Sequence, residues 1–233
     1  MKVILLTLCM MLFTLSVSAN IWKDDFEREE LGKDWTPTTW CAGDAPFNWN
    51  IDKGIIKGCW PNWDAQMLFL TEYPSLDYTI QVKCRIDKVW MEPGLAGAGF
   101  IFRSTGPEFI GGCIGPFYGY FIGSPQCGFM ICDGGGWQIT GAIPEKHNPD
   151  QWYTLKLVVK GDDFFTYVDD KPVCRLSDGR FRGKFVGLSI GSNIDASFDD
   201  FMISDRVDDQ ALIDFDVQAK DKLTTSWGYI KQK

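Results

Sequence analysis

The sequence contains a single histidine, His147, and no Cys-x-x-Cys pair. A zinc site needs several sulfur or imidazole ligands at short spacing, so a structural or catalytic zinc is not expected. A serine-hydrolase triad would depend on His147 alone, which argues against that chemistry. Neither Lys-Ser/Thr nor a helix pattern follows the run that begins at Gly134, so a phosphate-binding loop is not expected either. No Asn-x-Ser/Thr acceptor is present, so N-glycosylation is not predicted.

Positive charge is also scarce, because 23 Lys and Arg stand against 31 Asp and Glu, for a net charge of −8. Nucleic acids and anionic membrane surfaces attract the opposite sign, so neither is an expected partner. Beyond the first 19 residues no run approaches the roughly 18 apolar residues of a membrane-spanning helix, and we expect no membrane span. Hydrophobic residues make up 45% of the chain and aromatic residues 15%, which excludes an intrinsically disordered protein.

Residues 1–19 have the layout of a signal peptide. A basic start is followed by an apolar stretch from Val3 to about Leu15, and small residues precede Asn20. We therefore predict cleavage before Asn20 and a secreted, periplasmic or extracellular-surface location. The alternative interpretation is a short N-terminal anchor.

The chain has eight cysteines, one of them in the leader, which leaves an odd number for the mature protein. These are Cys41, Cys59, Cys84, Cys113, Cys127, Cys132 and Cys174. Export favours disulfides, so we expect up to three bridges and one remaining thiol. The local candidates are Cys41 with Cys59, and one pair among Cys113, Cys127 and Cys132.

Short apolar runs and period-two alternation dominate the mature chain, and turn-forming residues bound them. They predict strands over residues 49–51, 55–59, 67–70, 78–86, 97–103, 118–122, 128–132, 137–140, 152–160, 164–168, 171–176, 185–190 and 197–204. Hairpin turns are predicted at Asp52-Lys53-Gly54, Lys160-Gly161-Asp162 and Asp169-Asp170. No sustained 3.6-residue pattern lies between Trp22 and Ser204. The sequence therefore predicts an all-β sandwich or barrel, formed by one domain over residues 20–204.

The last 29 residues, 205–233, differ from the rest. They begin with a charged stretch and end with Trp-Gly-Tyr-Ile-Lys-Gln-Lys. Alternation at Ile213, Phe215 and Val217 is compatible with one more strand. A docking tail with an aromatic tip and a tail packed on its own domain are the other interpretations.

A series of motifs follows one order along the chain. They are Asp24-Asp25-Phe26 before Trp35, Trp49-Asn-Ile-Asp-Lys-Gly, Gly97-Ala-Gly-Phe-Ile-Phe-Arg103, Gly119-Tyr120-Phe121, Gln151-Trp-Tyr-Thr-Leu, Tyr167-Val-Asp-Asp-Lys-Pro and Phe198-Asp-Asp-Phe201. Over residues 22–204 this order resembles the concanavalin A-like lectin/glucanase superfamily, particularly its laminin-G-like branch and the 3-keto-disaccharide hydrolase-type domains. The resemblance implies a jelly roll of two antiparallel sheets packed face to face. It also implies that glycans are bound or cleaved on a concave face or at its rim.

The hydrolase-type branch implies an arginine at the end of a Gly-x-x-x-Arg strand, and Arg103 matches it. Its Gly-Tyr-Glu strand start has Phe121 in the Glu position here, and its His-Gly before the last strand is replaced by Gly191-Ser-Asn. Glycosidases need two carboxylates across the scissile bond, and Glu92 and Glu108 flank the Arg103 strand. The catalytic candidates are therefore Arg103, Glu92 and Glu108, with solvated loop acids as the alternative interpretation of the two glutamates.

Tryptophan offers a second type of site, because a sugar ring stacks its apolar face on an aromatic ring while nearby polar groups bind its hydroxyls. Several tryptophans stand in turns or at strand ends beside Asn, Asp, Glu or Gln. The ligand-binding candidates are Trp60, Asn62, Trp63, Asp64, Trp90, Arg103, Tyr118, Tyr120, Trp137 and Gln138. Trp35, Trp49 and Trp152 lie in apolar alternation and are predicted to belong to the core.

Paired acids at both ends of the domain form a candidate metal site. Asp24 and Asp25 lie near the first strand, and Asp199 and Asp200 near the last, and these strands pair in many jelly rolls. Carboxylate-rich ligation suits Ca²⁺, which would be a structural ion here. Ordinary strand-end acids are the alternative.

These observations favour an exported, non-catalytic jelly-roll domain that binds carbohydrate or another cell-surface ligand. One alternative is a glycan hydrolase or lyase acting on keto-sugar glycosides. Another is a structural cell-surface protein.

Overall fold

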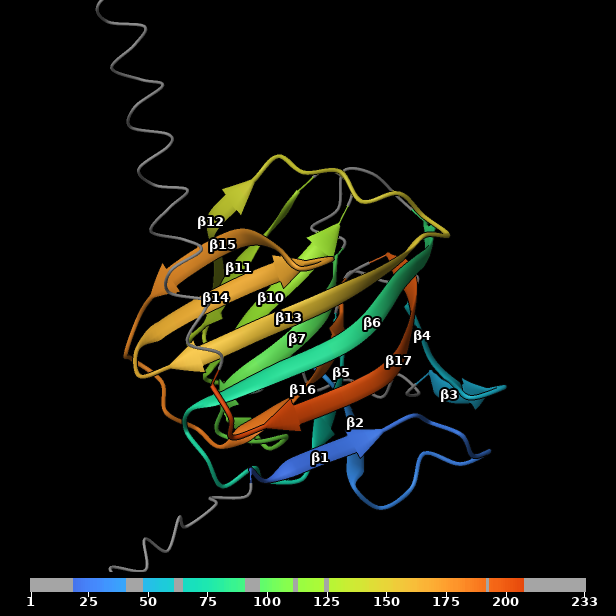
Figure 1. The fold of residues 1–233 in the computed structure, drawn as a ribbon, viewed down its shortest axis with the longest axis horizontal. Helices are drawn as coiled ribbons and strands as arrows, with labels where there is room; N and C mark the ends of the chain where they lie inside the picture. Colours follow the sequence, from blue (N-terminus) through green and yellow to red (C-terminus); the bar gives the residue numbers. More distant parts are fainter. Residues whose placement is uncertain are drawn as a thin grey trace, which may run out of the picture.

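The computed structural model describes residues 19–40, 48–60, 65–90, 97–110, 113–123, 126–191 and 193–207. These residues form two antiparallel sheets that pack face to face (Figure 1), as the sequence predicts for a jelly roll. The first sheet has eight strands, and the second has seven. No helix occurs among these residues, and therefore none that is long and apolar enough to cross a membrane.

The first sheet has the order β15-β14-β13-β6-β17-β4-β3, and β1 pairs with β17 beside this path. Its strands are β1 (Ile21–Asp24), β3 (Trp49–Asp52), β4 (Ile55–Trp60), β6 (Tyr78–Val89), β13 (Trp152–Lys160), β14 (Asp163–Val168), β15 (Lys171–Ser177) and β17 (Ile194–Ser204). Because β6 and β17 are long and central, they set the register of the residues considered below.

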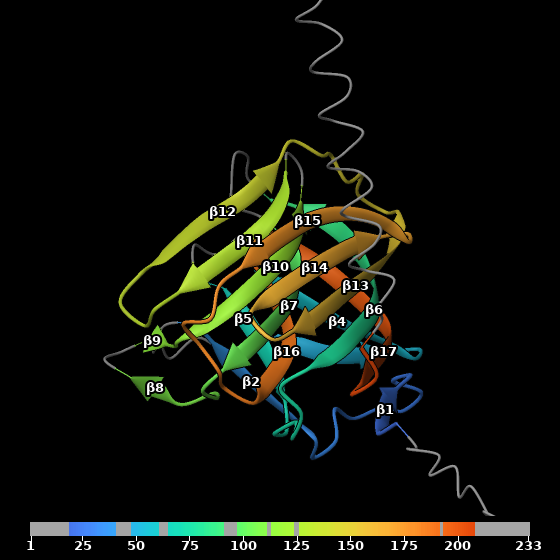
Figure 2. The ribbon, with the colours of Figure 1, turned by 60° about the vertical axis from the view of Figure 1, so that its left-hand side comes forward.

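The second sheet has the order β12-β11-β10-β7-β16-β5-β2. Its strands are β2 (Trp35–Thr39), β5 (Gln66–Leu70), β7 (Gly97–Ser104), β10 (Phe117–Gly123), β11 (Cys127–Cys132), β12 (Trp137–Ile143) and β16 (Phe185–Ile190). A small hairpin of β8 (Phe109–Ile110) and β9 (Cys113–Ile114) lies beside this sheet (Figure 2). On the outer face of the sheet, Ile114 of this hairpin belongs to a buried apolar cluster with Phe69 and Phe117.

Tight turns join neighbouring strands where the sequence predicts them. Lys53, Asp169 and Asp170 have φ of 54°, 49° and 60°, and Gly161 has φ of 58°. Lys53-Gly54 and Asp169-Asp170 have positive φ at both central residues, which defines the type I′ hairpin, whose twist matches that of the flanking strands. In the Gly161-Asp162 turn only Gly161 has positive φ. Asp is among the few residues other than Gly that adopt this conformation at small cost, which explains the Asp-Asp pair between β14 and β15.

The core lies between the sheets and is strongly aromatic. The ring centroids of Phe102 and Phe164 are 5.0 Å apart in an edge-to-face arrangement, and those of Tyr118 and Phe164 are 4.9 Å apart. Trp35 is buried here, as predicted, and it contacts Phe201 edge-to-face at 5.2 Å. Aromatic pairs of this kind add about 1 kcal/mol each beyond the area they bury.

Two main strands of the sandwich escape sequence-based prediction. β2 contains Pro37 and several threonines, and it is tolerated because it forms the edge of its sheet, where a missing N–H costs little. β1 is only four residues long and pairs with β17 alone. β17 also begins three residues earlier than predicted, because a bulge between Asp195 and Ala196 interrupts the alternation.

One predicted cysteine pair is wrong. Cys127 and Cys132 occupy the two ends of β11, about 16 Å apart along an extended chain, whereas a disulfide needs Cα atoms within about 7 Å. Both are free thiols, as is Cys59. Cys41 lies outside the described residues, so its pairing with Cys59 stays a prediction, as do the pairs that involve Cys113.

Candidate functional site

The ends of β4 and β6, near which several predicted ligand residues occur in the sequence, adjoin at one end of the sandwich. The backbones of Trp60 and Val89 both pair with Ile194 at the start of β17. The chain therefore leaves β4 and β6 at neighbouring points. Asn62, Trp63, Asp64 and Glu92 follow these points directly but lie outside the described residues.

Trp90 is the best-defined aromatic residue at this end. Its side chain is 46% exposed, although both its backbone and its ring are held in place. The indole Nε1 donates to Asp195 Oδ1 at 2.9 Å, and the backbone N–H donates to the carbonyl of Asn193 at 2.8 Å. The Lys88 ammonium lies 3.2 Å from the ring centroid, a cation–π contact. The ring is thus fixed in orientation while nearly half of its surface stays open.

Asp195 links this tryptophan to the sheet. It lies opposite both Cys59 and Lys88 in the register of β4, β17 and β6. Burial, together with the hydrogen bond and negative charge of Asp195, raises the pKa of the Cys59 thiol to about 11. Cys59 is therefore a neutral thiol at physiological pH, and the carboxylate remains the acceptor for Trp90.

Polar residues continue from Asp195 along the outer face of the first sheet. Ser197 Oγ donates to Asp87 Oδ2 at 2.5 Å, and Arg85 Nε donates to Asp87 Oδ1 at 2.6 Å. The Arg85 guanidinium lies 4.8 Å from the ring centroid of Trp152, which is half-buried on the same face.

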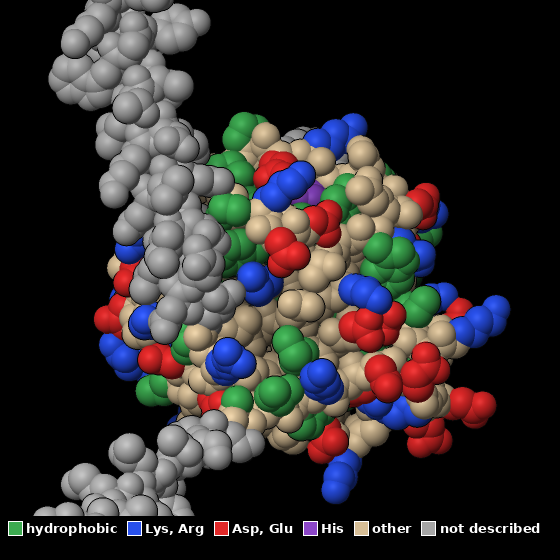
Figure 3. Space-filling model, in the orientation of Figure 1, with side chains coloured by type: hydrophobic (Ala, Val, Ile, Leu, Met, Phe, Trp, Pro, Cys, Tyr) green, Lys and Arg blue, Asp and Glu red, His purple; other side chains and the backbone are tan. Residues whose placement is uncertain are grey.

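We call this row of residues the aromatic strip. It consists of Trp90, Lys88, Asp195, Ser197, Asp87, Arg85 and Trp152. A tryptophan stands at each end, and planar carboxylate and guanidinium groups lie between them. The surface over β6, β13 and β17 mixes acidic, basic and hydrophobic side chains (Figure 3).

Trp137 and Gln138 lie at the opposite end of the molecule. Trp137, the first residue of β12, is 42% exposed and pairs with Cys132, the last residue of β11. Cys132 pairs with Phe117, the first residue of β10. The last residue of β10 pairs with Gly97, at the end of the sandwich where Trp90 lies. The structure therefore divides the predicted ligand residues between two ends, and Trp137 cannot share a small ligand with Trp90.

Arg103 is buried rather than presented to a ligand. Its side chain is 1% exposed, Nη2 donates to the carbonyl of Gly161 at 2.9 Å, and Asp77 lies 3.8 Å away. Its φ of 54° departs from the regular strand, and its guanidinium connects the second sheet to loops of the first. This position corrects the expectation that Arg103 faces a glycan.

The same correction applies to Tyr118 and Tyr120, which are fully buried in the core because they share the inner face of β10. Burial and a hydrogen bond to Asp178 raise the pKa of Tyr118 to about 12. Hydrogen bonds from Arg180 and Tyr118 lower the pKa of Asp178 to about 2 despite its partial burial. The pair anchors the segment between β15 and β16 to β10.

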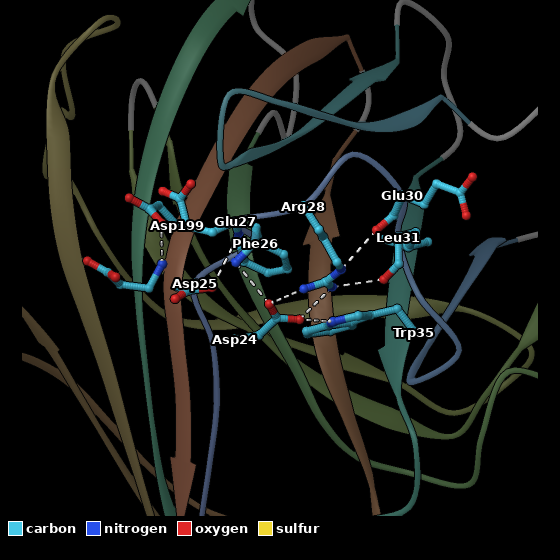
Figure 4. A network of polar contacts seen from close by, with 10 residues as sticks. Asp24, Asp25, Phe26, Glu27, Arg28, Glu30, Leu31, Trp35 and Asp199 are labelled. Carbon is cyan, nitrogen blue, oxygen red and sulfur yellow. Dashed lines mark hydrogen bonds and ion pairs between the residues drawn. The ribbon is translucent and has the colours of Figure 1, made fainter.

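The predicted metal residues gather at a corner where β1 meets β17, beside a cleft of about 810 Å³. The buried carboxylate of Asp24 accepts hydrogen bonds from both terminal nitrogens of Arg28, from Trp35 Nε1 and from the N–H of Phe26 (Figure 4). Burial raises the pKa of Asp24, but the hydrogen bonds outweigh it and lower the pKa below its usual value. Asp24 is thus fully occupied by protein donors.

The other acids at this corner are only partly committed. Asp200 forms an ion pair with Lys83 at 2.5 Å, and Asp25 accepts the N–H of Glu27. Burial and the neighbouring charge of Asp200 raise the pKa of Asp199, although the N–H of Asp200 partly opposes this. Within the described residues no three His, Cys, Asp or Glu side chains surround a common point. The four aspartates therefore do not form a complete cage by themselves, and calcium stays a prediction.

Of the three catalytic candidates, the structure describes only Arg103 and Glu108, and they lie in different environments. Glu108 is exposed, Glu92 lies outside the described residues, and Arg103 is buried. Residues 187–191 match the Gly-x-Ser-x-Gly pattern of a nucleophile elbow. However, Ser189 lies within β16 and continues an antiparallel ladder on both sides, so it does not stand on a strand-to-helix turn.

The polar members of the aromatic strip escaped sequence-based prediction. Their signal is modest: Arg85 and Asp87, like Asp195 and Ser197, occupy alternate positions on strands whose intervening residues are apolar. Such alternation marks an outward face but does not show which outward faces adjoin. Trp152, predicted to belong to the core, is half-buried on this outer face instead.

No protein-family model and no curated protein matches the chain. Several solved structures match its fold. Carbohydrate-binding module CBM66 from Bacillus subtilis has a TM-score of 0.57 and 19% identity, over 72% of this chain and 93% of that one. A mutant of the GH43 protein BlXynB from Bacillus licheniformis has a TM-score of 0.55 and 17% identity, over 78% of this chain and 38% of that one.

The exoplasmic/lumenal domain of VIP36, in a Ca²⁺/Man3GlcNAc-bound form, has a TM-score of 0.52 and 10% identity, over 76% of this chain and 85% of that one. Together these similarities confirm the fold expected from the sequence. The chain has a two-sheet jelly-roll fold like that of these solved structures. At these identities the similarity concerns the fold alone.

Proposed function

We propose that this domain binds carbohydrate through the aromatic strip, with Trp90 as the main stacking platform. The observation that carries the proposal is the state of Trp90: its ring is 46% exposed, yet it is fixed by Asp195 and Lys88. A platform that is already ordered loses little conformational entropy when a ligand binds.

The chemistry of the strip suits a sugar. One apolar face of a pyranose stacks on an indole, while its hydroxyls exchange hydrogen bonds with carboxylates and guanidinium groups. Asp87, Asp195 and Arg85 are such groups, and each is oriented by a neighbour on the same face. With a tryptophan at each end, the strip has room for more than one sugar ring.

The structural relatives support this proposal at the level of the fold, since two of them are a carbohydrate-binding module and a lumenal domain with bound Man3GlcNAc. The solved structures of similar fold also include a GH43 protein, and an enzymatic role is the alternative to binding. We propose a binding role, because Arg85 and Asp87 are paired with each other, and Asp195 and Lys88 are both engaged with Trp90, rather than held as a free acid and base. Export of the protein likewise remains part of the proposal.

A glycan array followed by titration calorimetry with the best oligosaccharide tests the proposal. Trp90→Ala should weaken binding by about thirty-fold, the effect of removing a residue worth about 2 kcal/mol. Trp137→Ala is the matched control, since it removes an equally exposed tryptophan at the opposite end and should leave Kd unchanged. No glycan binding by the natural chain, or equal loss in both variants with the fold intact, would reject the aromatic strip.

A further inference from the structure

Two cysteines from different sheets meet at one edge of the sandwich. Cys127 is the first residue of β11 in the second sheet, and Cys174 lies within β15 in the first. Edge strands β12 and β15 contact each other here, and Figures 1 and 2 show them side by side. This edge is therefore a place where the two sheets approach closely.

The two cysteines are neighbours in the core. Cys127 is 0% exposed and Cys174 is 3% exposed, and both belong to the same buried cluster. Cys174 Sγ lies 3.4 Å from the carbonyl oxygen of Gly141 in β12, the strand that pairs with β11 beside Cys127. The proximity of the two thiols raises the pKa of Cys127 and lowers the pKa of Cys174. Because each side chain points inward from its own sheet, contact needs no displacement of either backbone.

The backbone around Cys174 is fixed on both sides. Its N–H donates to Thr166 Oγ1 at 3.2 Å, and the Thr166 hydroxyl donates in turn to the Cys174 carbonyl. Cys127 is fixed by the antiparallel pairing of β11 with β12, where it lies opposite Ile143. Rigid positions of this kind favour bond formation, because little further entropy is lost when the two sulfurs join.

We propose that Cys127 and Cys174 form a disulfide that links the two sheets of the sandwich. This disulfide does not depend on carbohydrate binding. The proposed bond also replaces the expected pairing of Cys127 with a cysteine close to it in the sequence.

The oxidation uses a disulfide of the type RSSR as the oxidant, such as oxidised glutathione or the active-site disulfide of an oxidoreductase. The Cys174 thiolate attacks one sulfur of RSSR and releases one RS⁻, which leaves a mixed disulfide on Cys174. The Cys127 thiolate then attacks the protein sulfur and releases the second RS⁻. Two protein thiols lose two electrons and two protons, and RSSR becomes two RSH. The contact with Cys127 lowers the pKa of Cys174 despite its burial, which makes Cys174 the better attacking group.

The bond removes two thiol donors whose acceptors can be hydrated. In the reduced state Cys174 Sγ donates to the carbonyl of Gly141 at 3.4 Å, and Cys127 Sγ approaches Glu145 Oε2 at 3.8 Å. Both acceptors belong to exposed residues, so water replaces the lost thiol donors. The disulfide closes a loop of about 50 residues and restricts the unfolded chain accordingly.

Peptide mapping without reduction tests the proposal directly. The full chain is refolded in a mixture of oxidised and reduced glutathione, free thiols are alkylated, and the digest is analysed by mass spectrometry. The expected product is a cross-linked peptide pair containing Cys127 and Cys174. Cys174→Ser should abolish it, whereas Cys84→Ser, a control at another buried thiol, should leave it intact.

A stability measurement keeps the test independent of variants that fold poorly. Reduction by dithiothreitol should lower the thermal midpoint of the oxidised chain by about 5–15 °C. The double variant Cys127→Ala/Cys174→Val lacks both sulfurs, so dithiothreitol should not lower its thermal midpoint by breaking this bond. Full alkylation of both cysteines after oxidative refolding, or a bond from either of them to another cysteine, would overturn the proposal.

Discussion

The indole N–H of Trp90 and the carboxylate of Asp195 are joined by a 2.9 Å hydrogen bond, although 105 residues separate them in the sequence. This bond connects the end of β6 to the start of β17. It fixes the orientation of a ring that would otherwise be free to rotate at the rim of the sandwich. Asp195 therefore acts as a positioning residue for the proposed stacking platform.

Replacement of Asp195 by Asn should weaken glycan binding about tenfold, because Trp90 loses a charged acceptor and must be ordered when the ligand binds. Trp90→Phe should show a comparable loss, since the phenyl ring cannot donate to Asp195. Asp170→Asn serves as a control at an exposed acid in the β14–β15 turn. Unchanged affinity in Asp195→Asn would show that the hydrogen bond does not organise the site.

His147 should make the protein sensitive to mild acid. It is 1% exposed, and burial lowers its pKa, an effect that the negative charge of Glu145 only partly opposes. The native state therefore binds fewer protons than the unfolded state below about pH 6.5, the ordinary histidine value. Stability is complete above this pH and should fall by about 1 kcal/mol per pH unit below it, until the native-state pKa is reached.

Urea unfolding between pH 7.5 and 5.5 measures this slope. His147→Phe keeps an aromatic partner for Tyr153, whose ring centroid lies 4.9 Å from that of His147, and should flatten the slope. Because His147 is the sole histidine, no other imidazole contributes. An equal slope in the variant would assign the acid sensitivity to other groups.

Asp178 should stabilise the fold everywhere except in strong acid. Its pKa of about 2, against an ordinary 3.8, reflects hydrogen bonds from Arg180 and Tyr118, and its side chain is 13% exposed. The lowered pKa corresponds to about 2 kcal/mol of stability, present above pH 4 and lost as the pH falls toward 2. Asp178→Asn should show this loss at pH 7 and little difference from the natural chain at pH 2.

Asp52→Asn provides the comparison for Asp178. Asp52 forms an exposed ion pair with Lys57, and such pairs contribute little to stability. At pH 7 its replacement should change the free energy of unfolding by less than the replacement of Asp178 does. Equal effects of the two variants would show that the contacts of Asp178 with Tyr118 and Arg180 are not stabilising.

The predicted calcium ion has a direct test in thermal unfolding. An ion held only by the native state raises the midpoint with its concentration, and EDTA should reverse the increase. Asp199→Asn should remove the response, because Asp24 and Asp200 are already bound to Arg28 and Lys83. An unchanged midpoint in both CaCl₂ and EDTA would reject a metal at this corner.

Local patterns were sufficient for most strands and for their turns. Alternation along β13 and β16 gives their bounds correctly, and Asp169-Asp170 marks the hairpin between β14 and β15. β1 and β2 were missed because an edge strand needs little intrinsic preference once a neighbouring strand offers its hydrogen bonds. Tyr118 and Tyr120 occupy alternate positions of β10 and therefore share one face, but period two does not say which face is inside.

The sequence by itself determined the all-β class, most strand positions and the core location of Trp35, and the order of its motifs implied the jelly roll by resemblance. These properties depend on neighbours along the chain. Only the tertiary structure decided that Trp90 and Trp137 lie at opposite ends, that Asp195 orients Trp90, and that Cys127 meets Cys174. Those relationships depend on strand order and register, which antiparallel pairing sets across distances of many tens of residues.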